Sequence, residues 1–199
     1  MYKLILVAGL VMFVTGNGYA QKKSSLGVRA GLTSANLKFS GGGTSITADS
    51  KIGFYSGLFA QIGVSAKFAI QPEIFYSLLG TKFSQGSGED KVNLEYINLP
   101  VLAKYTNEGF SIIVGPQIGF LISAKEKTAA SNSDIKDSFN STDIAGIIGA
   151  GFTFTNGLGF DVRYQLGLAN IGSNDNPYLG DAKIKSNAFM VGLHFIFYK

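Results

Sequence analysis

Large apolar residues alternate with small or polar residues from Leu26 to the end of the chain. A period of two predicts strands whose two faces meet different surroundings. The clearest segment is 158–170, where Leu158 and Phe160 share one face while Asp161 and Arg163 share the other. We predict eight strands, at 26–37, 53–64, 68–82, 94–105, 110–123, 143–155, 158–170 and 185–198.

The segments between the predicted strands alternate in length. We expect short turns at 65–67, 106–109 and 156–157, and long polar loops at 38–52, 83–93, 124–142 and 171–184. Outer-membrane barrels have short periplasmic turns and longer extracellular loops. Each predicted strand also has at least the roughly 9–11 residues that a tilted strand needs to cross a bilayer. The pattern predicts an all-β fold, an eight-stranded antiparallel up-and-down transmembrane β-barrel with four long extracellular loops.

A soluble barrel of the lipocalin kind also alternates, with its apolar face turned inward. The polar face separates the two classes, because a face in water should be rich in Lys and Glu. Here that face is mostly Gly, Ala, Ser and Gln. Its few charged residues occupy positions that alternate with those of the large apolar residues. We therefore expect a narrow lumen filled by side chains. The predicted lumen network consists of Arg29, Gln61, Gln71, Glu73, Lys104, Gln117, Asp161, Arg163, Gln165 and His194.

Unpaired charges inside such a lumen would cost free energy. We expect Glu73 and Asp161 to pair with Arg29, Arg163 or Lys104, and the sequence leaves the choice of pairs open.

Composition agrees with a membrane barrel. The 199 residues are 46% hydrophobic and 15% charged, with a mean hydropathy of +0.21. No apolar run after residue 20 reaches the roughly 20 residues of a membrane helix. Aromatic residues near predicted strand ends are candidates for interfacial girdles. These candidates are Phe54, Tyr105, Phe110, Phe152 and Phe154.

The first twenty residues have the composition of a secretory signal peptide. Lys3 precedes an uninterrupted apolar stretch, and the small residues Gly18 and Ala20 stand where signal peptidase needs them. We predict cleavage after Ala20, so that residues 1–20 are a leader and residues 21–199 form one barrel domain.

The sequence offers few residues for chemistry. The formal charge of +4 is too small and too dispersed for nucleic-acid binding, and the chain has no cysteine for thiolate ligands or disulfides. His194 is the only histidine, and no nucleophile elbow is present. Glu73 and Asp161 could form an acid pair, but neutralisation by neighbouring Arg and Lys is the preferred interpretation. We expect no catalytic, metal-binding or cofactor-binding residues, no cofactor and no enzymatic activity.

Three segments resemble strands of the PorT-like outer-membrane β-barrel family of Bacteroidota. They read Gln71-Pro-Glu-Ile-Phe-Tyr-Ser77, Leu94-Glu-Tyr-Ile-Asn-Leu-Pro-Val-Leu-Ala-Lys-Tyr105 and Val114-Gly-Pro-Gln-Ile-Gly-Phe-Leu-Ile-Ser-Ala-Lys125. Tyr96 and Asn98 interrupt the family's more uniformly aliphatic strand. The resemblance implies an outer-membrane location and a closed barrel. The aromatic last strand also resembles the signal that barrel-insertion machinery recognises, although Lys199 departs from the common ending in Phe.

These observations predict an integral outer-membrane protein with a structural or interaction role. A narrow pore for small solutes is the alternative, and a lipid-modifying enzyme or a component of a secretion assembly ranks below it. The expected partners are outer-membrane lipid, lipopolysaccharide and the insertion machinery, with surface protein partners left open.

Overall fold

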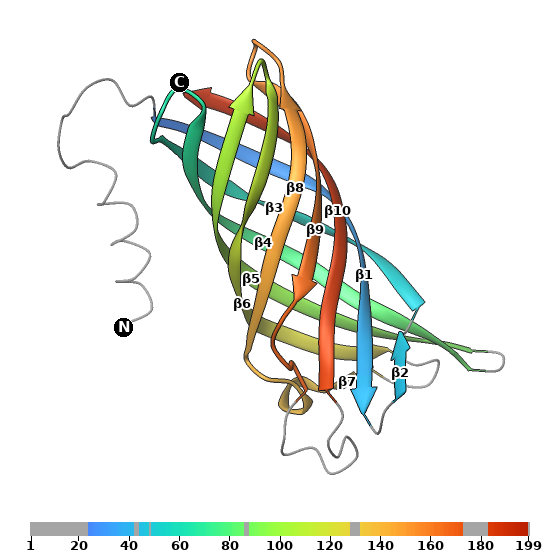
Figure 1. Cartoon of the computed structure of the whole chain (residues 1–199). Coiled ribbons are helices and arrows are strands. Elements are labelled where there is room, and N and C mark those ends of the chain that lie inside the picture. The colour runs from blue at the N-terminus through green and yellow to red at the C-terminus, as the bar shows by residue number, and fades with distance from the viewer. Residues whose placement is uncertain are drawn as a thin grey trace, which may run out of the picture.

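The structure is a computed structural model of the chain that describes residues 24–41, 44–47, 49–85, 88–127, 132–172 and 183–198. One β-sheet rolls into a closed barrel (Figure 1). Its wall consists of β1 (Ser24–Gly41), β3 (Asp49–Gly63), β4 (Phe68–Gln85), β5 (Gly88–Asn107), β6 (Phe110–Lys127), β8 (Thr142–Thr153), β9 (Leu158–Gly167) and β10 (Lys183–Tyr198). Two short strands, β2 (Thr44–Thr47) and β7 (Asn132–Asp134), pair with β1 and β6, and a 3-10 turn, η1, spans Lys136–Ser138.

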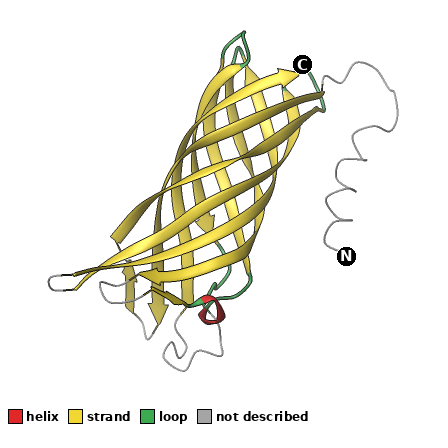
Figure 2. Cartoon of the chain, turned by 180° about the vertical axis from the view of Figure 1, so that it is seen from behind, coloured by secondary structure: helices red, strands yellow, loops and turns green. Residues whose placement is uncertain are grey.

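Each wall strand pairs antiparallel with the wall strands beside it in the sequence. The first and last strands close the barrel, in a register that runs from Leu26 opposite Tyr198 to Ser40 opposite Lys183. Closure removes the free edges that an open sheet would expose. The view from behind shows a continuous wall of tilted strands (Figure 2). The predicted fold is therefore confirmed, and no helix among the described residues is long and apolar enough to cross a membrane.

The predicted turns and loops differ in accuracy. The short turns fall at one end of the barrel, which we call the proximal end, together with the start of β1 and the end of β10 (Figure 1). The prediction of four long loops at the opposite, distal end is wrong for 83–93 and for most of 38–52. β4 and β5 run through 83–93 except for residues 86–87, and strands occupy most of 38–52, whereas the strands within the described part of 124–142 are only the end of β6, β7 and the first residue of β8. Of the fourth loop, 171–184, residues 173–182 lie outside the described part.

The turn between β5 and β6 has only two residues, Glu108 and Gly109, and both have positive φ, at 49° and 85°. Two-residue hairpins favour this backbone form because its twist matches that of the strands. Glycine adopts it freely, whereas a residue with a side chain does so at a cost. The glycine at 109 therefore allows the tight turn.

The outer wall of the proximal part is an apolar band. On β10, Phe189, Val191, Leu193, Phe195 and Phe197 are all exposed. Eight residue steps of about 3.3 Å span about 26 Å along the strand, which strand tilt reduces to about 20 Å along the membrane normal. This height is close to the apolar band of outer-membrane barrels, roughly 25 Å. The band is therefore the surface that meets lipid.

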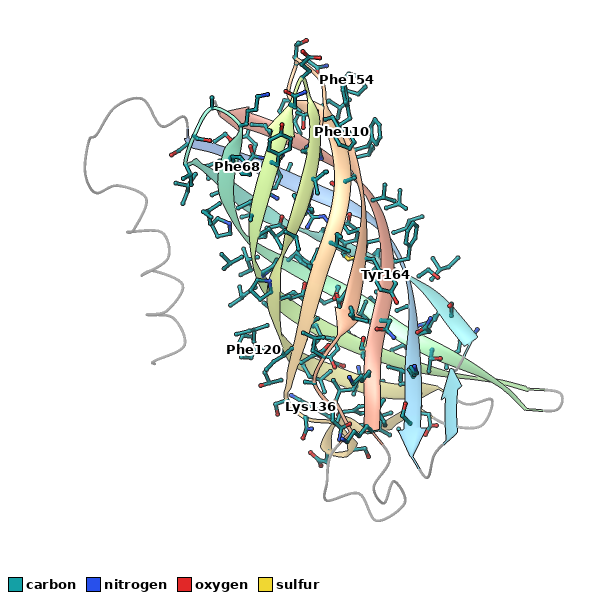
Figure 3. The ribbon with its side chains drawn as sticks, viewed as in Figure 1. Phe68, Phe110, Phe120, Lys136, Phe154 and Tyr164 are labelled. Carbon is teal, nitrogen blue, oxygen red and sulfur yellow. The ribbon has the colours of Figure 1, made fainter. Side chains whose placement is uncertain are left out.

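Aromatic residues mark the two limits of this band. Figure 3 shows Phe68, Phe110 and Phe154 at the proximal end and Phe120 toward the other limit, with Lys136 beyond it. The remaining girdle candidates sit in aromatic contacts. The ring centroids of Tyr105 and Phe68 lie 5.1 Å apart, those of Phe152 and Phe154 lie 5.2 Å apart, and those of Phe54 and Tyr76 lie 5.6 Å apart.

Beyond the band the barrel reverses its polarity. A cluster of buried, mostly apolar residues, here called the distal core, begins inside the band at Phe75 and Met190 and continues to the distal end, where outward positions carry Lys, Asn and Glu. The sequence predicts that the charged residues and the large apolar residues point to opposite faces of each strand. This prediction is wrong in this part of the barrel, because Phe75 and Leu79 share the inward face of β4 with Glu73. The wall outside lipid meets water, so its apolar residues turn inward. The distal core comprises Ala35, Leu37, Tyr55, Phe75, Leu79, Val92, Leu94, Tyr96, Leu121, Ala124, Ile171, Ile184, Ala188 and Met190.

Candidate functional site

Four charged side chains meet at the centre of the membrane-embedded lumen, and we call them the charge cluster: Arg29, Glu73, Asp161 and Arg163. Arg29 Nη1 donates to both oxygens of Glu73, at 2.8 and 2.9 Å, and Arg29 Nη2 donates to Asp161 Oδ2 at 2.7 Å. Arg163 donates from Nε to Asp161 Oδ1 at 2.7 Å and from Nη1 and Nη2 to Glu73 at 2.9 and 3.1 Å. All four residues are buried, at 2–4% exposed. Two guanidinium groups and two carboxylates therefore form a closed ring of ion pairs with no net formal charge.

Gln71, Gln61 and His194 extend the charge cluster toward the proximal end. Gln71 Nε2 donates to Glu73 Oε1, and Gln61 Nε2 donates to Gln71 Oε1 at 3.0 Å. On the other side, His194 Nδ1 lies 3.2 Å from Asp161 Oδ2, and His194 Nε2 lies 2.9 Å from Thr153 Oγ1. These hydrogen bonds orient the two carboxylates toward the arginines.

The backbone leaves room for this packing. Gly159 stands opposite His194 in the register of β9 and β10. A Cβ atom at Gly159 would lie 2.3 Å from His194 Nε2, closer than any real contact allows. The Arg29 guanidinium also lies over the Phe59 ring, 5.3 Å from its centroid. Small residues at inward positions therefore let the ring of ion pairs form inside a narrow barrel.

A second, uncharged layer lies on the distal side of the charge cluster, beside residues of the distal core. Gln117 Nε2 donates to Asn98 Oδ1 at 3.0 Å and to Gln165 Oε1 at 3.1 Å, and Asn98 Nδ2 donates to Ser77 Oγ at 2.9 Å. Gln117 and Gln165 belong to the predicted lumen network, whereas Asn98 and Ser77 do not. Asn98 has the same parity as Lys104 on β5, and that parity could have identified it.

The structure brings nine of the ten residues of the predicted lumen network into these two hydrogen-bonded layers. Lys104 is the exception. It is buried in the lumen at 6% exposed, yet no ion pair or hydrogen bond joins its ammonium to another residue in the described part of the chain. Glu73 and Asp161 pair with both arginines, so Lys104 is left outside the ring.

The side chains of the charge cluster fill the lumen and pair with one another. Each carboxylate of the charge cluster already accepts hydrogen bonds from both guanidinium groups. Within the described ranges, no three His, Cys, Asp or Glu side chains gather closely enough to hold a metal ion. Arg29 Nε has no hydrogen-bond partner among the described residues, but the other donors of both guanidinium groups that face the carboxylates are engaged, and a network of this density rigidifies its surroundings.

Comparisons with known proteins agree with this description. The sequence model of the family described as "Outer membrane protein beta-barrel domain" matches residues 19–173. The chain belongs to this family. The protein is thus an outer-membrane β-barrel, and its predicted localisation is confirmed. Among curated proteins, none matches its sequence.

Two solved structures show the same fold as this outer-membrane barrel. Neisserial surface protein A is 15% identical with a TM-score of 0.55, over 86% of this chain and 97% of its own. Ail, the attachment invasion locus protein of Yersinia pestis, is 16% identical with a TM-score of 0.51, over 89% of this chain and 100% of its own. At these identities the likeness concerns the fold alone.

Proposed function

We propose that the protein is a closed outer-membrane barrel with an interaction role rather than a pore. The observation that carries this proposal is that side chains fill the lumen at two levels. The charge cluster crosses the middle of the membrane-embedded part, and the distal core fills the interior from there to the distal end. The alternative, a narrow pore for small solutes, would require both levels to open. Proposals to act on lipid or to join a secretion assembly lack a corresponding site in the described residues.

The interaction surface that we propose is a group of three lysines on the seam between β1 and β10, called here the lysine seam: Lys38, Lys183 and Lys185. Lys38 stands directly opposite Lys185 in the register of the two strands, and Lys183 lies two residues before Lys185, at the start of β10. Like charges in directly opposed positions destabilise a sheet. Neither β1 nor β10 contains an acidic residue that could balance them. An anionic partner would relieve this repulsion.

The position of the lysine seam supports one kind of anionic partner. Lys185 lies four residues beyond Phe189, the last apolar outward residue of β10. Four steps of about 3.3 Å, reduced by strand tilt, place the lysine about 10 Å beyond the edge of the apolar band. The polar headgroup layer of a bilayer occupies about this depth. We therefore propose that the lysine seam binds phosphates of lipopolysaccharide in the outer leaflet.

One barrel of the same fold supports the polyanion chemistry. Ail of Yersinia pestis has been crystallised in complex with the heparin analogue sucrose octasulfate, with a TM-score of 0.50 and 15% identity to this chain. The charge repulsion within the lysine seam remains the main support.

The proposal is tested by titrating the folded barrel in zwitterionic detergent with detergent-dispersed lipopolysaccharide. Replacing all three seam lysines by glutamine should weaken binding at least about tenfold, because each lysine near an anionic surface contributes about 1 kcal/mol. The control triple variant replaces three exposed lysines outside the seam, Lys67 in the turn between β3 and β4, Lys125 on β6 and Lys136 in η1, and changes the net charge equally. Equal weakening in both variants, or no binding by the unaltered protein, would overturn the proposal.

Two finer proposals concern identity and export. The resemblance of β4, β5 and β6 to PorT-like strands of Bacteroidota supports membership of that subgroup. The residues of the proposed leader, 1–20, lie outside the described part of the structure. Intact mass spectrometry of the protein from outer membranes should give a chain that begins at Gln21, and a chain that retains Met1 would contradict the leader.

A further inference from the structure

A recess opens at the proximal end of the barrel, away from the lysine seam. Its volume is about 460 Å³, and its lining includes Gln61, Lys104, Thr106, Glu108 and Thr155. Thr106 and Glu108 belong to the end of the β5–β6 hairpin, and Thr155 to the connection between β8 and β9. The recess is therefore the proximal mouth of the lumen, and its volume suits a small molecule.

Lys104 forms the inner limit of this recess. Its side chain lines both the recess and a small gap beside the charge cluster. The charge cluster is neutral by itself, so it offers Lys104 no spare carboxylate. A buried ammonium without a counter-ion carries a large desolvation cost. Lys104 thus presents to the recess a positive charge that no ion pair balances among the described residues.

The rest of the lining restricts the class of anion. Thr106 and Thr155 place hydroxyl groups nearer the mouth, and Ile196 gives the recess an apolar side. Glu108 adds a carboxylate to the lining, and it would repel a doubly charged ligand more strongly than a singly charged one. One ammonium at the inner end and one carboxylate nearer the mouth favour a monoanion.

We propose that Lys104 binds a small organic monocarboxylate in this recess. The ammonium donates hydrogen bonds to the carboxylate, Thr106 or Thr155 donates from its hydroxyl group, and a short apolar tail lies against Ile196. Because short turns are periplasmic in outer-membrane barrels, the ligand arrives from the periplasm. The site is independent of the lysine seam, so either proposal can fail while the other stands.

The test is a titration of the isotope-labelled, folded barrel in zwitterionic detergent micelles with butyrate, followed by amide NMR. The backbone amides of Gln61, Lys104, Thr106 and Thr155 should shift saturably. Lys104→Met should weaken binding at least about tenfold, since a hydrogen bond to a charged group contributes about 1.5–3 kcal/mol. Lys67→Met, which removes an exposed lysine from a turn at the same end, should leave the affinity unchanged.

A second variant and two competing anions test the proposal even if the Lys104→Met variant does not fold. Glu108→Gln removes the repelling carboxylate from an exposed turn and should tighten butyrate binding severalfold. Inorganic phosphate and chloride serve as competitors, and both should bind more weakly than butyrate. The proposal is overturned if the unaltered barrel shows no saturable shift, if phosphate or chloride binds as well as butyrate, or if Glu108→Gln has no effect.

Discussion

Arg163 and Glu73 are joined across the full width of the barrel, with Arg163 Nη1 and Nη2 at 2.9 and 3.1 Å from the Glu73 carboxylate. They lie on β9 and β4, and three wall strands separate β9 from β4 in either direction around the barrel. The two side chains therefore meet from opposite walls. An ion pair with this placement closes the lumen and ties together strands that share no backbone hydrogen bonds.

Glu73 is the residue whose loss should disturb this arrangement most. Glu73→Ala leaves two buried guanidinium groups with one remaining carboxylate, Asp161. Removal of one partner from a buried ion pair costs about 3–5 kcal/mol, because the remaining charge stays buried. Equilibrium urea unfolding in phospholipid vesicles measures the loss. Glu126→Gln, a change in the distal part of β6 away from the charge cluster, is the control and should cost little.

Gly192 is expected to be required for the packing of Tyr55 against β10. A Cβ atom at Gly192 would lie 2.2 Å from Tyr55 Oη and 2.8 Å from the carbonyl oxygen of Ala30. Gly192→Ala should therefore cost about 1–3 kcal/mol, as overpacking typically does. In combination with Tyr55→Phe, which removes the clashing hydroxyl group, it should cost less than the sum of the two changes.

The matched control for this prediction is Gly146→Ala on β8. A Cβ atom there would meet nothing within 4 Å. Unfolding of the four variants under the same conditions gives the comparison, and equal losses at Gly192 and Gly146 would contradict the packing argument.

The limits of the lipid-facing band can be tested on one face of β10. Leu193 is 62% exposed at the middle of the apolar stretch from Phe189 to Phe197, whereas Asn187 lies just beyond it. Leu193→Lys should destabilise the folded barrel in vesicles by about 2–4 kcal/mol, and Asn187→Lys by about 0–1 kcal/mol. If the two substitutions cost the same, the band has been placed wrongly.

Much of the fold follows from the alternation of residues along each strand. The segment 158–170 predicts β9 well because lipid covers one whole face of that strand, so its outward residues are uniformly large and apolar. The charged residues of the lumen were predictable for the same reason. Arg29, Asp161 and Arg163 interrupt strands that are otherwise apolar, small or weakly polar, and their parity assigns them to the inside.

The distal part was harder to predict because it lies beyond the lipid. Residues 83–93 are mostly polar, as loops are, yet Val92 is buried and β5 begins at Gly88. Where the outer face of a strand meets water, apolar and polar residues still alternate, but the apolar residues point inward. A search for strands with outward apolar residues therefore does not find these segments. The sequence also could not predict that Lys104 lies outside the ring of ion pairs. That outcome depends on how strands that are distant in the sequence align around the lumen.

Recording of ionic current through the purified protein in planar lipid bilayers is the most direct test of a closed lumen. Two filled levels, the charge cluster and the distal core, should keep the current at the baseline of the protein-free bilayer across the applied voltages. A stable open state with reproducible conductance steps would contradict the closed barrel and would support the alternative of a narrow pore.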